Sequence, residues 1–348
     1  MTDLMLYTRT ATECVAMLKS GDVSPTELVH ASIERIEAVD GDVNALPDHC
    51  FERALESARV IEADPSVAGV LRGLPIAVKD YNDVGGVRTT YGSPIFAKNV
   101  PERSDATVER LESNGAIPMA KSNVPEWAGG NTFNPEHGTT RNPWDLSRTA
   151  GGSSGGSAAA LATGQVWLAT GNDLGGSLRT PAAFNSIVGL RPSPGRVPRG
   201  QRLEAFDTLW VEGPMGRTVE DTALMLDAGC GAHPHDPLAF DSPGFSFAQS
   251  VHMGALHKRV AFSSDLGIVP MAAEVASICA QSTRKLEQLG VQVTDDAPDF
   301  TGAVDAFQTQ RACLLATMME SLLAEHRQSI TPVIIDNVER GLNIKPAQ

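Results

Sequence analysis

The chain has 348 residues, 42% of them hydrophobic and 20% charged, a balance that excludes disorder over its whole length. No run rich in lysine or arginine interrupts the formal net charge of −14, which argues against direct binding of nucleic acid. The first residues lack the basic and apolar regions of an export signal, and no stretch approaches the roughly 20 apolar residues that cross a bilayer.

Two helices are predicted near the N-terminus. The segments Thr10–Glu13 and Ser24–Glu27 both have the spacing of a capping box, in which two side chains bond each other's backbone N–H groups. Pro25 follows the second cap at the first helical position, where a missing N–H breaks no bond. We expect residues 1–65 to form a helical segment packed on a core that spans residues 66–348.

Strands and helices then alternate, which indicates a layered α/β fold. The predicted elements are a buried strand at 74–78, a helix at 105–114, a strand at 116–120, a helix after residue 156 and a strand at 166–170. Turn-forming and aromatic residues at 123–150 favour an ordered functional loop. After a mostly irregular stretch at 200–257 we expect four further elements, namely strands at 259–263 and 291–294 and helices at 272–289 and 303–326. The expected architecture is a single mixed, twisted sheet flanked by helices on both sides.

The cysteines and histidines form no recognisable metal or redox site. Five widely spaced cysteines include no C-x-x-C pair, and a reducing cytoplasm suits such a set best. His233 and His235 lie close in sequence, but no series of nearby ligands repeats a known metal-binding spacing. We therefore expect a cytoplasmic protein with no metal and no membrane partner, and we keep a homodimer as an open alternative.

Residues 151–196 contain two loops of glycine and serine around a small-residue helix and a strand. Glycines allow positive φ and close approach of the backbone, so a serine among them can lie beside several converging N–H groups, as an oxyanion site requires. A run such as GGSSGGS more often forms a flexible linker. Here it leads directly into a buried-looking helix and is followed by a second loop that ends at Ser177, so we favour a site with a serine nucleophile.

Other motif interpretations fit this segment less well. Gly151–Gly155 matches the G-x-S-x-G nucleophile elbow, but no strand precedes it and no convincing Asp and His pair follows. A phosphate loop would need Gly-Lys-Ser/Thr at its end, whereas Gly156 is followed by serine and alanine. The glycine spacing also differs from that of dinucleotide-binding loops. Because the segment contains no histidine, another base must take the serine proton.

Three segments resemble the signature block of the amidase signature family, namely GGSSGGSAAALATG, GNDLGGSLRTPAAF and GLRPSPGRVP. The resemblance continues upstream and covers most of residues 10–200, through LRGLPIAVKD, GVRTTYGS and RNPWDLSR. It implies the fold of that family and hydrolysis of amides without metal or organic cofactor. It also implies a catalytic triad, with Lys79 as base, Ser153, after an unusual cis peptide bond, as proton relay, and Ser177 as nucleophile.

A lysine can act as this base only when it is neutral. The usual lysine pKa is about 10.4, and burial lowers it by up to roughly 3 to 5 units because the ammonium form loses its hydration. Lys79 ends an apolar strand, which favours such burial. The alternative is a surface ion pair of Lys79 with Asp80 or Asp83, as most lysines form.

The resemblance assigns further roles around the triad. The expected donors of the oxyanion hole are the N–H groups of Leu174, Gly175 and Gly176, together with that of Ser177. The residues expected to support the loops are Ser154, Asn172, Asp173 and Arg179. Substrate binding is expected from Gly129 and Gly130.

Three features depart from the usual pattern of the family. Asn172 replaces a threonine and Leu174 replaces threonine or isoleucine, and neither change removes a triad group. Family members usually continue with a segment that lines the pocket, so we expect the C-terminal part of the fold to be missing. The favoured function is hydrolysis of a small-molecule carboxylic amide to acid and ammonia or amine. Two alternatives stay open: the glutaminase-type subunit of a tRNA-dependent amidotransferase, and a catalytically silent truncated relative.

Overall fold

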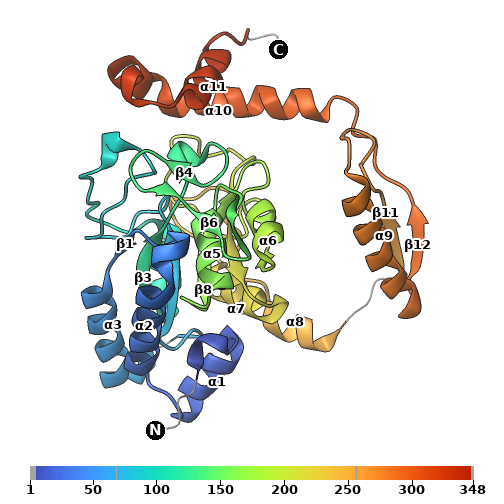
Figure 1. Cartoon of the computed structure of the whole chain (residues 1–348). Helices are drawn as coiled ribbons and strands as arrows, with labels where there is room; N and C mark the ends of the chain where they lie inside the picture. The colour runs from blue at the N-terminus through green and yellow to red at the C-terminus, as the bar shows by residue number, and fades with distance from the viewer. Residues whose placement is uncertain (1–4, 68, 255–257, 346–348) are drawn as a thin grey trace.

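A mixed sheet of six strands lies at the centre of the part of the chain that the computed structural model describes, residues 5–67, 69–254 and 258–345 (Figure 1). The first four residues of the expected N-terminal segment, the last three of the stretch 200–257 and the last three of the expected core lie outside these ranges. The strand order is β1 (Asp48–His49), β3 (Ala116–Ser122), β2 (Leu74–Lys79), β8 (Leu168–Asp173), β10 (Val211–Gly216) and β9 (Val188–Gly189). β2 pairs in parallel with β3 and β8, whereas β1, β9 and β10 pair antiparallel.

Helices cover both faces of the sheet, because successive side chains of a strand point to opposite faces. Ala77 of β2 belongs to one hydrophobic cluster. The helices in that cluster are α2 (Pro25–Val43), α3 (Phe51–Ala63) and α5 (Gly155–Ala162). Ile76 and Val78 belong to the cluster on the other face. Its helices are α1 (Ala11–Ser20), α4 (Ala106–Ser113) and α7 (Val219–Gly229). The expected α/β fold with one mixed sheet between helices is confirmed.

The N-terminal helices begin where the capping boxes predict. Thr10 and Ser24 each accept a hydrogen bond from the backbone N–H three residues later, and the glutamate at that position bonds back to the cap. Both α1 and α2 bury residues in the clusters of the sheet, and β1 joins the sheet directly. The division of the chain at residue 65 stays a prediction.

The middle of the chain differs from the expectation in two places. The predicted strand at 166–170 is β8, which extends to Asp173, so part of the expected second loop is strand. The expectation that 200–257 is mostly irregular is wrong, since it holds β10, α7 and α8 (Phe247–Met253). β10 contains two glycines and a proline, which rarely form an isolated strand, and its pairing with β8 on one side and β9 on the other stabilises it.

The expected functional loop at 123–150 is ordered into short hairpins. Its strands are β4 (Phe133–Asn134), β5 (Gly138–Thr139), β6 (Arg141–Asn142) and β7 (Asp145–Thr149). They pair as β4 with β5 and β6 with β7, next to the first glycine loop. Figure 1 shows β4 below the long C-terminal helix.

The C-terminal region lies to one side of the sheet and above it (Figure 1). A separate parallel pair forms beside one helix, with strands β11 (Arg259–Phe262) and β12 (Gln292–Asp295) and helix α9 (Ala273–Gln288). Two more helices, α10 (Ala303–His326) and α11 (Pro332–Leu342), pack against each other over the core. The four elements predicted beyond residue 257 are confirmed to within one residue, whereas α11 was not predicted. Among the described residues, the helices are too short or too polar to cross a membrane.

Candidate active site

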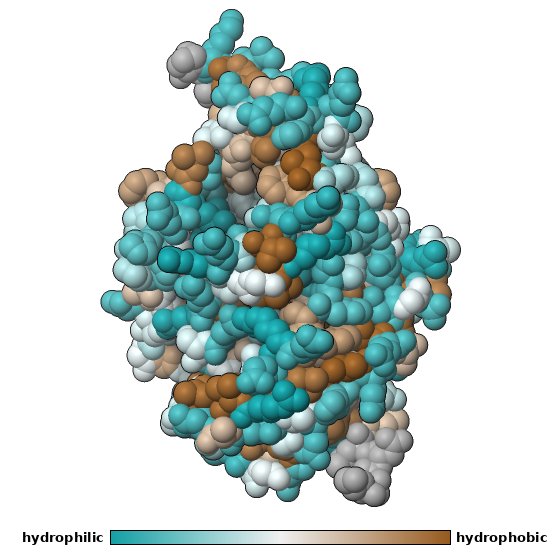
Figure 2. All heavy atoms as spheres, turned by 90° about the vertical axis from the view of Figure 1, so that its left-hand side faces the viewer, coloured by the Kyte–Doolittle hydropathy of each residue, from teal (hydrophilic) through white to brown (hydrophobic). Residues whose placement is uncertain are grey.

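A cavity of about 350 Å³ lies between the loops that follow β2, β3 and β8 and the C-terminal helices. Because these three strands are parallel, their carboxyl ends and the loops after them meet at the same edge of the sheet. Seen from the side of α2 and α3, the surface is hollowed below the C-terminal helices (Figure 2). Of the residues expected in the site, the cavity is lined by Gly129, Gly130, Ser153, Asn172, Leu174, Gly175 and Ser177.

Lys79 lies at the end of β2 with its side chain 0% exposed. Its Nζ donates to Ser153 Oγ at 2.7 Å and to Asn172 Oδ1 at 2.6 Å. Burial lowers the pKa of Lys79 to about 7, although the nearby carboxyl groups of Glu212 and Asp173 act in the opposite direction. Lys79 is therefore held largely neutral at neutral pH by two acceptors, and the alternative of a surface ion pair is wrong.

Asp80, the next residue, binds a different lysine. Its Oδ1 lies 3.1 Å from Lys121 Nζ, and both side chains are buried. Lys121 also donates to Asn82 O at 2.6 Å and to Thr89 Oγ1 at 2.7 Å. Asp80 in turn accepts from the backbone and side chain of Thr90. The charge of Asp80 is thus compensated away from Lys79, which leaves the pKa of Lys79 to burial.

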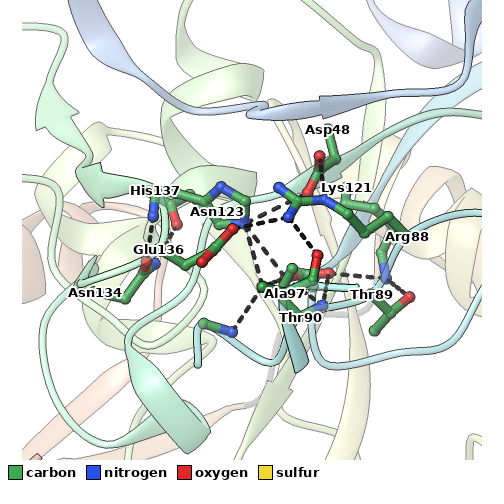
Figure 3. Close-up of polar contacts among 12 residues, drawn as sticks. Asp48, Arg88, Thr89, Thr90, Ala97, Lys121, Asn123, Asn134, Glu136 and His137 are labelled. Carbon is green, nitrogen blue, oxygen red and sulfur yellow. Dashed lines mark hydrogen bonds and ion pairs between the residues drawn. The ribbon is translucent and has the colours of Figure 1, made fainter. Parts of the chain in front are cut away.

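The same network continues outward and holds the loop after β2 (Figure 3). Arg88 bridges Asp48 at 2.9 Å and Glu136 at 2.8 Å. His137 lies 3.4 Å from Asp48, and burial lowers its pKa. Sequence reasoning missed this network, although the lysine and serine that end β3 carried the same strand-end signal as Lys79.

The first glycine loop places Ser153 against Lys79. The peptide bond between Gly152 and Ser153 is cis, as the family resemblance implies. A Cβ on Gly152 would lie 2.2 Å from Gly130 O, so only glycine allows this approach of the two loops. Ser153 is 1% exposed, yet it lines the cavity and faces Lys79.

Asp173 organises the second glycine loop. Its carboxylate accepts from Gly176 N at 2.7 Å and from Leu178 N at 3.2 Å, and it binds Arg179 at 2.9 Å. Burial acts to raise the pKa of Asp173, and these hydrogen bonds together bring it below its ordinary value. The N–H of Gly176, expected in the oxyanion hole, is therefore occupied in this structure. Leu174 and Gly175 line the cavity, and their N–H groups bond no acceptor among the described residues.

Ser177 is half-buried and lines the same cavity as Ser153. Ser154 connects the two loops, since its N–H donates to Ser177 O at 3.3 Å and its hydroxyl to Asn172 O at 3.4 Å. The structure thus brings Lys79, Ser153 and Ser177 to one wall of one cavity. Their catalytic roles stay predictions at this point. In the described part of the chain, no group of three or more histidines, cysteines and acidic residues is placed to hold a metal ion.

Comparison with known proteins places this arrangement in a family. The family model described as Amidase matches residues 27–340. The chain belongs to the amidase signature family.

Relatives of the chain within the amidase signature family carry two kinds of name. It is 39% identical over 82% of its length to a glutamyl-tRNA(Gln) amidotransferase subunit of Moorella thermoacetica. It is 37% identical over 86% of its length to an acylamidase of Rhodococcus erythropolis. The chain spans 59% of the first relative and 64% of the second.

Solved structures of amidase signature enzymes have the same fold. A bacterial aryl acylamidase of this family superposes with a TM-score of 0.89 at 29% identity, covering 97% of this chain and 73% of that one. A 6-aminohexanoate cyclic dimer hydrolase superposes with a TM-score of 0.87 at 27% identity, covering 99% of this chain and 73% of that one. The likeness therefore includes the C-terminal helices as well as the sheet.

The outer wall of the cavity in this amidase signature chain comes from residues that sequence reasoning missed. From the body of the protein the lining includes Tyr81, Trp127, Ala128, Asn131 and Trp210. From α10 and α11 it includes Phe307, Arg311, Leu314, Leu315, Met318 and Ile334. A Cβ on Gly175 would meet Phe307 at 2.8 Å and one on Gly129 would meet Ile334 at 2.5 Å, so both helices lie directly on the glycine loops. The helical spacing of these apolar residues was the available signal.

Proposed function

We propose that this chain hydrolyses a small-molecule carboxylic amide through an acyl-enzyme on Ser177. The observation that carries this proposal is the buried contact of 2.7 Å between Lys79 Nζ and Ser153 Oγ, on the cavity wall that also holds Ser177. A serine needs a base, and a lysine whose pKa burial lowers to about 7 accepts a proton at neutral pH.

The proposed reaction uses the residues in sequence. Ser177 Oγ attacks the amide carbonyl and gives its proton to Ser153, which passes its own proton to Lys79. The N–H groups of Leu174 and Gly175 donate to the oxyanion as it forms. The proton then returns through Ser153 to the leaving nitrogen, and ammonia or an amine departs. Water attacks the acyl-enzyme by the same relay and releases the carboxylic acid, so no cofactor is consumed.

A fluorophosphonate probe with an amide library tests the proposal. The folded chain is expected to lose its activity on amides when the probe attaches, and peptide mapping is expected to locate the label on Ser177. The Ser177→Ala variant is expected to take up no label. A folded chain that neither reacts with the probe nor hydrolyses any amide would instead support the silent relative.

A second candidate is the glutaminase-type subunit of a tRNA-dependent amidotransferase. It is favoured by the name of the Moorella relative, whereas the acylamidase name of the Rhodococcus relative favours the first proposal at similar identity. The two separate by assay. A glutaminase is expected to release ammonia from glutamine and to co-purify with its partner proteins, whereas an independent amidase is expected to act alone.

A cytoplasmic location and a homodimer complete the proposal. All five cysteines are free, as a reducing compartment maintains them. Fractionation of the native host tests the location, and sedimentation of the purified chain tests the dimer.

A further inference from the structure

Arg311 is a charged residue in an otherwise apolar helix face. α10 lines the cavity with Phe307, Arg311, Leu314, Leu315 and Met318. Steps of four, three, one and three residues put these side chains on the same side of a helix. The period of the helix therefore directs the guanidinium of Arg311 to a wall where the pattern calls for an apolar residue.

Arg311 has no partner in the protein. Among the described residues, it makes no hydrogen bond and no ion pair, and no aspartate or glutamate lines the cavity. Its half-buried position and the like charge of Arg340 both lower its pKa. An arginine nevertheless stays protonated at neutral pH. A partly desolvated cation without an acceptor is unfavourable, so a ligand that supplies the acceptor gains binding energy.

The other lining residues describe the rest of the ligand. Tyr81, Trp127 and Trp210 face Leu315 and Ile334 across the same cavity, so the space around the guanidinium is mainly aromatic and aliphatic. A volume of about 350 Å³ is at the lower end of the range for small-molecule sites. The cavity therefore fits a small molecule with an apolar body and one anionic group.

We propose that Arg311 binds a carboxylate of the substrate, so that the preferred substrates are amides that carry a free carboxylate. Half-amides of dicarboxylic acids and N-acyl amino acids belong to this class. This inference rests on the proposed amide hydrolysis and specifies its substrate class. The guanidinium can donate two parallel hydrogen bonds to a carboxylate, a geometry that neutral or cationic amides cannot use.

Matched pairs of amides test the inference. Glutaryl-4-nitroanilide and 5-methylhexanoyl-4-nitroanilide have the same shape, but only the first has a carboxylate, on the acyl side. N-butanoyl-4-aminobenzoate and N-butanoyl-4-isopropylaniline form the corresponding pair on the amine side. In at least one pair, the native chain is expected to prefer the acid by about 10- to 100-fold in kcat/KM, mainly through KM.

Three variants assign the preference to the guanidinium. Arg311→Gln is expected to remove it and to change hydrolysis of the neutral partner by less than about twofold, while Arg311→Lys keeps part of it because the charge remains. Arg284→Gln, on the exposed face of α9, removes the same charge far from the cavity lining and is expected to keep the full preference. Equal hydrolysis of acid and neutral amides, or a preference that survives in Arg311→Gln, overturns the inference.

A binding measurement separates this inference from the proposed hydrolysis. If no amide is hydrolysed, the proposed function fails, but glutarate and 4-aminobenzoate can still be titrated into the folded chain by calorimetry. Binding by the native chain that is lost in Arg311→Gln and kept in Arg284→Gln supports the carboxylate site. Equal binding by the native chain and Arg311→Gln, or no binding at all, overturns it.

Discussion

The sheet and the C-terminal helices contribute to the same cavity in different ways. Lys79 and Ser153 are almost fully buried and belong to the region of the two large hydrophobic clusters. α10 and α11 share only a small cluster with each other, which reaches the body of the protein at Ile95 and Trp127. α9 has no buried residue.

This difference corresponds to two physical requirements. A base made from lysine needs a position without water and with fixed acceptors, because burial is what lowers its pKa. A group that recognises substrate must instead be reached by it. The structure therefore places the tuned groups in the densely packed sheet and the selective ones on helices that cover the cavity. Substitutions in the two regions are expected to have separable effects on turnover and on selectivity.

The largest effect is expected from Ser177→Ala. Removal of the hydroxyl deletes the nucleophile, so amide hydrolysis is expected to fall by about 10⁵- to 10⁶-fold. Ser177 is only half-buried, and the midpoint of urea unfolding is expected to stay unchanged. Progress curves with purified native and variant chains measure the first, and denaturation measures the second. Ser154→Ala, in the same loop, is the control and is expected to retain most activity. Full hydrolysis by Ser177→Ala would remove the nucleophile assignment.

The next effect concerns pH. Lys79 is protonated and inactive below its pKa of about 7 and neutral above it, so kcat/KM is expected to rise through pH 7 and level off at higher pH. Lys79→Ala is expected to lose most of the rate together with this limb, as pH profiles of both chains would show.

The position of that limb alone does not identify the lysine, because an ordinary histidine titrates nearby. His137→Gln is therefore the matched control, since His137 is a buried histidine of the neighbouring network. It is expected to keep the limb. A limb lost in His137→Gln and retained in an active Lys79→Ala would contradict the mechanism.

Two isoleucine truncations compare the regions directly. Ile76→Ala, in the cluster beside β2, is expected to lower the free energy of unfolding by about 2–5 kcal/mol. Ile334→Ala, on α11, is expected to raise KM for an apolar amide several-fold, because the side chain lines the cavity, and to leave kcat nearly unchanged. Chemical denaturation and steady-state kinetics on both variants test the contrast. A larger fall of kcat than of KM-linked affinity in Ile334→Ala would contradict the division of roles.

The smallest expected effect is a shift of the acidic limb in Glu212→Gln. Glu212 lies opposite Asn172 in the pairing of β8 with β10, and both of its carboxyl oxygens are buried without a hydrogen bond. Its charge acts to raise the pKa of Lys79, so removing it is expected to move the limb to lower pH. The rate below neutral pH then rises relative to the plateau. A limb that moves to higher pH, or does not move, would show that Glu212 carries no charge in the active form.

Local patterns in the sequence predict much of the core. The two capping boxes predict where α1 and α2 begin, because each cap depends only on residues three positions apart. The apolar run before Lys79 predicts a buried strand with a charged end. β10 was missed for the opposite reason, since its glycines and proline become a strand only through the bonds of its two neighbours.

The pairings among charged residues were beyond such local patterns. Asp80 is adjacent to Lys79 in sequence, but its partner is Lys121 on the next strand of the sheet. Arg311 lies in a helix that was predicted to its last residue, yet the pattern does not say which neighbours its face meets. Both outcomes depend on which segments the fold brings together.

The sequence by itself determined the two glycine loops, the strand that ends at Lys79 and the order of most elements, because these depend on residues near one another in the chain. Only the tertiary structure decided that Lys79 is buried against Ser153 and Asn172, which are 74 and 93 residues away. It also decided that the N–H of Gly176 is taken by Asp173 and that Arg311 faces the cavity without a partner. Burial and charge compensation depend on distant segments meeting in space, so the protonation state of the base and the preference for a substrate are properties of the fold.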